Sequence, residues 1–261
     1  MDFFDIHTHI YPDDIAQKAT DSVRNFYEIG GAGMNGTVSQ LLARGKEAGI
    51  SRFLLLPVAI RPDRATHIND FILQQVNLHP EFIGFGTVHA GMPALMDEVD
   101  RISTMGLQGI KMHPDSQRFH IDDPRLYPMY EHIQGKLPIL LHMGDHRYDY
   151  SHPIKLRRIL DQFPRLQAVA AHFGGYSMYE QAYDLLKDTN CILDVSSSLM
   201  FMSQGEAERY IRLYGAERMA FGSDYPLWDP VQEVNRFLQL QLTPDELEQI
   251  AWKTAHRFLK L

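Results

Sequence analysis

The sequence predicts an α/β fold in which eight parallel strands alternate with helices, the (β/α)8 or TIM-barrel architecture. Short continuous apolar runs, such as residues 53–58 and 168–172, are typical of strands that are buried on both faces. Stretches with apolar residues three and four positions apart separate these runs and indicate helices. The 261 residues suit one such barrel. We therefore expect a single domain that spans residues 1–261.

The first expected strand begins at Phe3 and ends in Asp-Ile-His-Thr-His at residues 5–9. Because side chains alternate along a strand, His7 and His9 should lie on one face. Two histidines on one face make half of a metal site, although such a pair is also a common surface feature. Residues 30–33, Gly-Gly-Ala-Gly, are interpreted as a mobile loop. Thr37 is the expected N-cap of the helix that leads to the second strand.

The rest of the chain repeats the same alternation. No glycine-rich phosphate fingerprint follows an early strand, so an open dinucleotide-binding sheet has no support. The expected strands after the first cover residues 53–58, 82–89, 107–113, 139–142, 168–172, 192–195 and 219–222. Helices are expected from Asp13, at 37–49, 63–78 and 93–104, after Pro124, after Pro153, and at 178–187, 206–214, 231–240 and 244–259.

Composition limits the classes of function. The net charge of -8, without a basic run, argues against nucleic acid as the main partner. No apolar run is long enough to span a membrane, and the N-terminus lacks a basic segment followed by an apolar one, so we expect a soluble, cytoplasmic protein. Cys191 is the only cysteine, which excludes an internal disulfide and a thiolate cluster. A metal would therefore be held by nitrogen and oxygen, and the 13 histidines are the unusual feature.

Polar side chains gather at the carboxyl ends of the expected strands. In a parallel barrel these ends converge on one face, which is the face that carries the chemistry. A single histidine after a strand is more often a solvent-facing residue, but several on the same rim favour a site. The residues at strand ends are His7, His9, Lys111, His113, His142, His172 and Asp224.

Four cationic or basic residues, two of them already named at strand ends, are candidate substrate-binding groups. Lys111 and His113 alternate onto one face of their strand, and a lysine inside a barrel is costly unless it meets an anion such as a substrate carboxylate. Arg61 and Arg147 follow expected strands, and guanidinium groups suit a carboxylate or phosphate. The alternative for these arginines is a solvated surface charge.

Four motifs together resemble a known family. They are His-x-His on the first strand, Leu-His-Met-Gly around His142, Ala-His-Phe-Gly-Gly around His172, and Phe-Gly-Ser-Asp-Tyr-Pro around Asp224. This combination is similar to the amidohydrolase superfamily, and specifically to its amidohydrolase family 2 branch. That branch holds hydrolases beside decarboxylases similar to aminocarboxymuconate-semialdehyde decarboxylase. The resemblance extends over essentially the whole chain.

The resemblance implies one divalent metal ion held by His7, His9, His142 and Asp224. Zinc is the expected ion and manganese the alternative. Asp224 and His172 are then the expected catalytic residues: Asp224 would accept the proton of a metal-activated water, and His172 would orient the water or polarise a substrate carbonyl. The resemblance also suggests a homodimer.

Two positions leave alternatives open. Phosphotriesterase-like members of the superfamily use a carbamylated lysine on the fourth strand to bridge two metals, and Lys111 lies on the expected fourth strand; we expect it to face substrate instead. Related chains carry Asn-Ala-x-Arg near the C-terminus, whereas this one has Thr-Ala-His-Arg at residues 254–257. That change is expected to affect a structural cap and leave the metal site unaltered.

The expected function is that of a metal-dependent hydrolase, which cleaves an ester, lactone or amide bond of a small, carboxylated molecule. The alternative is a metal-dependent, non-oxidative decarboxylase of an unsaturated or aromatic carboxylic acid. A third class is a barrel that binds metal or ligand without turnover. The pairing of His172 with Asp224 argues against this third class, because a structural zinc site closes its coordination and needs no proton-transfer pair.

Overall fold

The computed structural model describes residues 1–30 and 33–261, and these fall into two compact units. Unit 1 contains Met1–Leu56 and Val195–Leu261, and unit 2 contains Pro57–Asp194. Of the predicted mobile loop, Gly31 and Ala32 lie outside the described residues. Within the described ranges, no helix is both long enough and apolar enough to cross a membrane.

Unit 1 begins with two parallel strands that are joined through helices. All six residues of β1 (Phe3–Thr8) are buried, and β1 pairs with β2 (Ile50–Leu55). Helices α1 (Ala16–Phe26) and α2 (Val38–Ala48) lie between them in sequence. The Thr37 side chain accepts a hydrogen bond from the Gln40 amide, which confirms the predicted N-cap.

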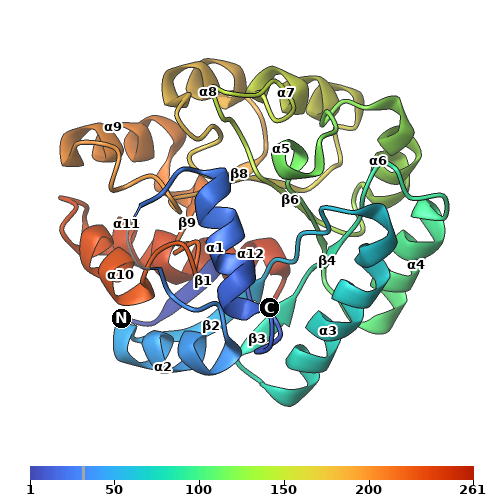
Figure 1. Ribbon diagram of the computed structural model, residues 1–261. Coiled ribbons are helices and arrows are strands. Elements are labelled where there is room, and N and C mark those ends of the chain that lie inside the picture. Colours follow the sequence, from blue (N-terminus) through green and yellow to red (C-terminus); the bar gives the residue numbers. More distant parts are fainter. Residues whose placement is uncertain (31–32) are drawn as a thin grey trace. The chain divides into compact units, whose positions relative to one another are not determined.

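The C-terminal part of unit 1 is mainly helical, and α10 packs beside α2 (Figure 1). The expected helix at 244–259 is divided by a π-helical turn, after which Thr254 and Arg257 both donate to the Glu217 carbonyl. The elements are α9 (Gln204–Tyr214), η3 (Ala216–Arg218), β9 (Met219–Ala220), α10 (Pro230–Leu238), α11 (Pro244–Glu248), the π-helix η4 (Gln249–Lys253) and α12 (Thr254–Leu259).

Unit 2 holds parallel strands β4 to β8, which pair with one another in chain order. Its strands are β3 (Phe82–Gly84), β4 (Gly86–Thr87), β5 (Ile110–Met112), β6 (Ile139–Leu141), β7 (Ala168–Ala170) and β8 (Ile192–Asp194). Its helices are η1 (Pro62–Arg64), α3 (Ala65–Leu78), α4 (Leu95–Met105), α5 (Pro114–Gln117), η2 (Pro124–Leu126), α6 (Tyr127–Ile133), α7 (Pro153–Gln162) and α8 (Tyr179–Leu186). In Figure 1 the pairs α3 and α4, α4 and α6, and α7 and α8 lie side by side.

The third expected strand, residues 82–89, differs from its prediction because it is divided into β3 and β4 at Phe85. The Phe85 ring is fully buried and packs against Gly109, where an added Cβ would lie 2.4 Å from the ring. Several other strands end one or two residues earlier than predicted. The histidines at 113, 142 and 172 therefore lie just after their strands, outside the paired strand residues of the sheet.

Candidate metal centre

Backbone hydrogen bonds in unit 1 align the end of β1 with the segment that follows β9. The Asp224 amide donates to the His7 carbonyl at 2.8 Å, and the His9 amide donates to the Tyr225 carbonyl at 2.8 Å. The fully buried Asp5 carboxylate accepts from the amides of His7, at 3.0 Å, and Ser223, at 2.9 Å. Asp5 thereby connects the two segments that carry the candidate ligands His7, His9 and Asp224.

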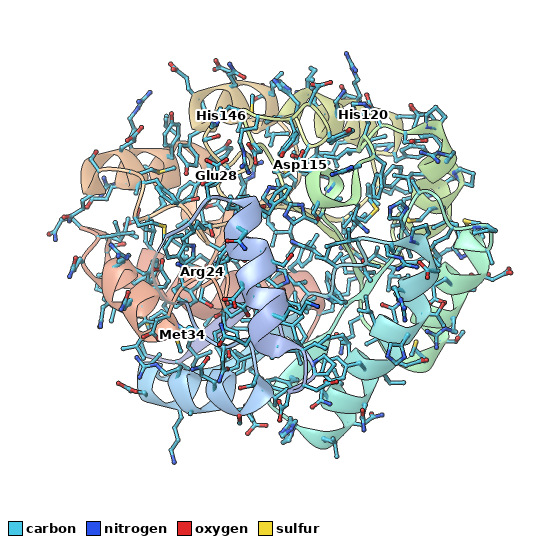
Figure 2. The ribbon with its side chains drawn as sticks, in the orientation of Figure 1. Arg24, Glu28, Met34, Asp115, His120 and His146 are labelled. Carbon is cyan, nitrogen blue, oxygen red and sulfur yellow. The ribbon has the colours of Figure 1, made fainter. Side chains whose placement is uncertain are left out.

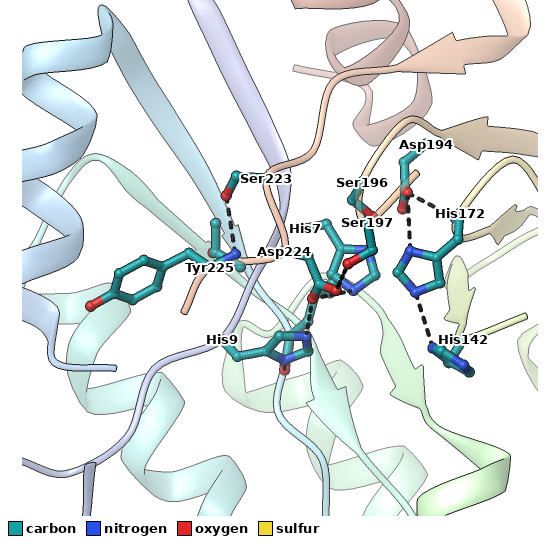
Figure 3. Close-up of polar contacts among 12 residues, drawn as sticks. His7, His9, His142, His172, Asp194, Ser196, Ser197, Ser223, Asp224 and Tyr225 are labelled. Atoms are coloured by element: carbon teal, nitrogen blue, oxygen red, sulfur yellow. Dashed lines mark hydrogen bonds and ion pairs between the residues drawn. The ribbon is translucent and has the colours of Figure 1, made fainter. Parts of the chain in front are cut away.

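The side chains of His7, His9 and Asp224 converge in unit 1, and we call these three the metal-binding group. Asp224 Oδ1 lies 3.2 Å from His9 Nε2 and 3.6 Å from His7 Nε2 (Figure 3). One possible ligand atom from each residue lies within 4.8 Å of the others. His7 and Asp224 are buried, and His9 is nearly so. A group of two histidines and one aspartate suited to a divalent metal ion is therefore present.

The hydrogen bonds of the two histidines fit a bound cation. His9 Nδ1 bonds to the Leu56 carbonyl, and because a carbonyl only accepts, Nδ1 carries the proton of the neutral ring. His9 Nε2 then directs a lone pair at a carboxylate oxygen, an arrangement that a cation between them stabilises. His7 Nδ1 bonds to the Ser196 hydroxyl at 3.0 Å. Such outer partners orient imidazole ligands, and a donor set without sulfur suits zinc or manganese.

Close backbone approach and a left-handed residue place Asp224. A Cβ added at Gly222 would lie 2.8 Å from the His7 Cβ and 3.1 Å from the Ser196 Cβ, so only glycine fits. Asp224 has φ 58°, which turns the chain sharply after β9 and directs the carboxylate toward the two histidines. The second carboxylate oxygen, Oδ2, accepts a hydrogen bond from Ser197.

The predicted site histidines His142 and His172 meet in unit 2. The His172 amide donates to Asp194 Oδ1 at 3.0 Å, and His172 leaves its strand with φ 59°. His172 Nε2 lies 3.0 Å from His142 Nδ1 (Figure 3). His142 Nε2 lies 3.1 Å from the Gly144 carbonyl, so it must donate, and Nδ1 of the neutral ring then accepts from His172.

A second polar group surrounds His142. The rings of His113 and His142 stack with centroids 3.8 Å apart, and Asp115 Oδ2 lies 3.5 Å from His142 Nε2. Asp115 lies in the first turn of the short helix α5 (Figure 2) and accepts a hydrogen bond from Ser151. Burial, supported by repulsion from Asp145, raises the pKa of Asp115 to about 7. His113, Asp115 and His142 form a second set of potential metal ligands.

The predicted substrate residues have different surroundings. Lys111 on β5 is fully buried, and His113 is nearly so. The Arg147 side chain donates to both oxygens of the buried Asp145 carboxylate, from Nε to Oδ1 at 3.0 Å and from Nη2 to Oδ2 at 2.7 Å. The Arg61 side chain is 67% exposed and pairs with Asp63, as expected of a surface charge. Arg61 therefore has the surroundings of a surface charge, whereas Arg147 is held by a buried carboxylate.

Sequence reasoning missed several residues that orient the expected ligands. Asp5 lies two positions before His7, and Asp115 lies two positions after His113. Side chains two positions apart on a strand lie on the same face, so the alternation that selected His7 and His9 could also have selected these aspartates. Ser196 and Ser197 directly follow the predicted strand at residues 192–195, as Asp224 follows the predicted strand at 219–222. Their roles depend on contacts between distant segments, so spacing alone does not reveal them.

A sequence model of the family described as Amidohydrolase matches residues 4–261. The chain belongs to the amidohydrolase family. This match confirms the resemblance drawn from the four motifs. No curated protein matches the sequence.

Solved structures with the same fold cover the whole chain. An uncharacterised TIM-barrel protein from Bordetella bronchiseptica is 20% identical, with a TM-score of 0.84 and coverage of 100% of this chain and 99% of that one. The 5-carboxyvanillate decarboxylase from Sphingomonas paucimobilis is 18% identical, with a TM-score of 0.75 and 99% coverage of each chain. A dihydroxybenzoic acid decarboxylase from Polaromonas sp. JS666, with bound manganese and 2-nitroresorcinol, is 17% identical, with a TM-score of 0.75 and coverage of 99% and 97%.

These similarities confirm the predicted (β/α)8 fold class and correct the predicted function. The two similar enzymes from Sphingomonas paucimobilis and Polaromonas are decarboxylases of aromatic acids. The expected cleavage of an ester, lactone or amide is therefore wrong. Hydrolase and decarboxylase sites are hard to separate by residue type, because both need a metal ion and a proton-transfer group.

Proposed function

We propose that this protein is a metal-dependent, non-oxidative decarboxylase of a small aromatic carboxylic acid such as a hydroxylated benzoate. The observation that carries the proposal is the metal-binding group of unit 1, in a chain that resembles two decarboxylases over 99% of its length. Because one of those structures holds manganese, manganese is the first ion to test, with zinc as the alternative. The homodimer and the cytoplasmic location stay predictions.

The reaction replaces a carboxylate by a proton. The bond between the ring carbon and the carboxylate breaks, carbon dioxide leaves, and the electron pair that remains on the ring carbon takes up a proton. The step consumes neither water nor an oxidant. A bound divalent cation would supply Lewis-acid stabilisation of negative charge on the substrate oxygens. The protein must supply the proton and orient the acid.

Asp224 and His172 are the proposed proton-transfer residues. Asp224 is held by Ser197 through Oδ2, which leaves Oδ1 facing His7 and His9. His172 is buried, and its amide is fixed by Asp194. We further propose that His142 is the fourth ligand and that Lys111, His113 and Arg147 interact with the substrate carboxylate.

The test is carbon dioxide release from carboxyl-labelled substrates. The protein, loaded with manganese, is offered 5-carboxyvanillate and dihydroxybenzoates, beside a panel of lactones and esters scored by acid release. We expect carbon dioxide and the decarboxylated phenol in equal amounts, with loss of the reaction in His9→Ala and on metal removal. Arg61→Ala is the matched control and should keep full activity. Acid release from a lactone without carbon dioxide would overturn the proposal.

A further inference from the structure

A chain of hydrogen bonds in unit 1 leads from an aromatic side chain to the metal-binding group. Trp228 Nε1 donates to Ser197 Oγ at 2.8 Å, and Ser197 Oγ donates to Asp224 Oδ2. Figure 3 shows the contact between Ser197 and Asp224 beside the contacts of Asp224 with His7 and His9. The two carboxylate oxygens thus have separate partners: Oδ2 meets the serine and Oδ1 meets the histidines.

The direction of this chain follows from donor chemistry. The indole N–H can only donate, so the Ser197 oxygen must accept from Trp228. A serine hydroxyl has one proton, and an ionised carboxylate can only accept. The single proton of Ser197 is therefore directed at Asp224 Oδ2. Because Ser197 is 5% exposed, water has little access to compete for it.

The backbone at both ends of the serine contact supports a functional arrangement. Ser197 has φ 48° and Asp224 has φ 58°, which is the left-handed region of backbone conformation that residues other than glycine rarely adopt. Residues persist in this region where their surroundings determine the conformation, and they concentrate at ligand clamps and active sites. Two such residues here hydrogen-bond to each other.

We propose that Ser197 and Trp228 are positioning residues for the metal ligand Asp224. Ser197 occupies Oδ2, so Asp224 presents Oδ1 alone and binds the ion through one oxygen. Trp228 fixes the proton of Ser197 in the orientation that this requires. The inference rests on the metal centre of the proposed function and adds a chain of outer partners to it. Because Trp228 is linked through Ser197 to the metal ligand Asp224, its fluorescence should also change when a metal ion binds.

The first test is the affinity for zinc, measured by calorimetry on metal-free protein. Ser197→Gly removes the hydroxyl and leaves a residue that adopts positive φ without strain. Loss of an outer partner weakens metal binding by about 10- to 100-fold, and we expect that loss here. Trp228→Phe keeps the aromatic ring and removes the donor, so we expect a smaller loss of about threefold to tenfold. The double variant should bind zinc no more weakly than Ser197→Gly, because Trp228 acts on Asp224 only through the hydrogen bond from Ser197.

A matched serine separates this role from a purely structural one. Ser203 is exposed and caps α9 by accepting from the Glu206 amide, with no part in the metal-binding group. Ser203→Ala should lower the melting temperature and leave the zinc affinity unchanged. Wild-type zinc affinity in folded Ser197→Gly would overturn the proposal. If Ser197→Gly does not fold, unchanged affinity in Trp228→Phe overturns it.

The second test uses the fluorescence of the two tryptophans. Trp252→Phe leaves Trp228 alone, and addition of zinc, which is not redox-active, should change its emission. Trp228→Phe leaves Trp252, which packs against Phe4 and His256, and this emission should not respond. An unchanged Trp228 signal while calorimetry shows zinc bound would sink the proposed connection. Neither readout needs turnover, so a failed decarboxylase assay would leave this inference standing.

Discussion

At the scale of single residues, hydrogen bonds decide which nitrogen of each histidine is available. His9 Nδ1–H donates to the Leu56 carbonyl, which leaves Nε2 for a metal ion. His142 Nε2–H donates to the Gly144 carbonyl, which leaves Nδ1 to accept from His172. The two rings therefore present opposite nitrogens. If His142 binds an ion through Nδ1 in this tautomer, the ion replaces the hydrogen bond from His172, because that nitrogen has a single lone pair.

Alanine variants should separate these two histidines. His142→Ala should lose metal and turnover together, because a ligand is removed. His172→Ala should keep the metal and lower turnover by about 10²- to 10⁴-fold, the usual contribution of a positioned acid or base. Elemental analysis and the carbon dioxide assay measure the two effects. Full turnover in His172→Ala would refute its role, and full metal content in His142→Ala would exclude it from the ligands.

At the scale of elements, two helical glycines of unit 1 differ in what surrounds them. A Cβ added at Gly45 on α2 would lie 2.1 Å from the Phe53 ring on β2. Gly205, in the first turn of α9, has nothing within 4 Å of an added Cβ. Helix propensity favours alanine at both positions, so packing alone distinguishes them.

Gly45→Ala and Gly205→Ala should change stability in opposite directions. Gly45→Ala forces α2 away from β2, and we expect a loss of roughly 1–3 kcal/mol in the free energy of unfolding. Gly205→Ala restricts the unfolded chain without a clash and should add about 0.5–1 kcal/mol. Urea unfolding of both variants checks this pair. Stabilisation of Gly45→Ala would show that the contact relaxes at little cost.

At the scale of the whole molecule, the open question is the number of metal ions. Unit 1 carries His7, His9 and Asp224, and unit 2 carries a group of His113, Asp115 and His142. Lys111 is fully buried on β5, which suits either a substrate contact or a carbamate bridge between two ions. Metal stoichiometry distinguishes these alternatives.

We expect about one metal ion per chain in both the wild type and Lys111→Ala, as one site of this kind implies. Lys111→Met, which better conserves side-chain volume, is the companion variant in case alanine leaves a destabilising cavity. Metal content by elemental analysis is the measurement. Two ions in the wild type, reduced to one in the variants, would identify Lys111 as a bridging carbamate.

The sequence by itself determined the class of fold and the donor types of the expected metal site, but it predicted hydrolysis, which is wrong. Alternating apolar runs and helical patterns predicted the barrel because both periods are local properties of the chain. The rule that side chains alternate along a strand placed His7 and His9 on one face, and the strand-end argument added Asp224. The absence of a cysteine cluster limited the donors to nitrogen and oxygen.

Only the tertiary structure decided how those residues are held. The contact between Asp5 and Ser223 joins residues 218 positions apart, and the one between Ser196 and His7 spans 189 positions. No periodicity reports such pairings, since they depend on how distant segments pack. Arg61 follows a predicted strand like the other candidates, but its exposed side chain pairs with Asp63, two residues away. Residue types predicted a metal site, and packing determined the partner of each oxygen and nitrogen in it.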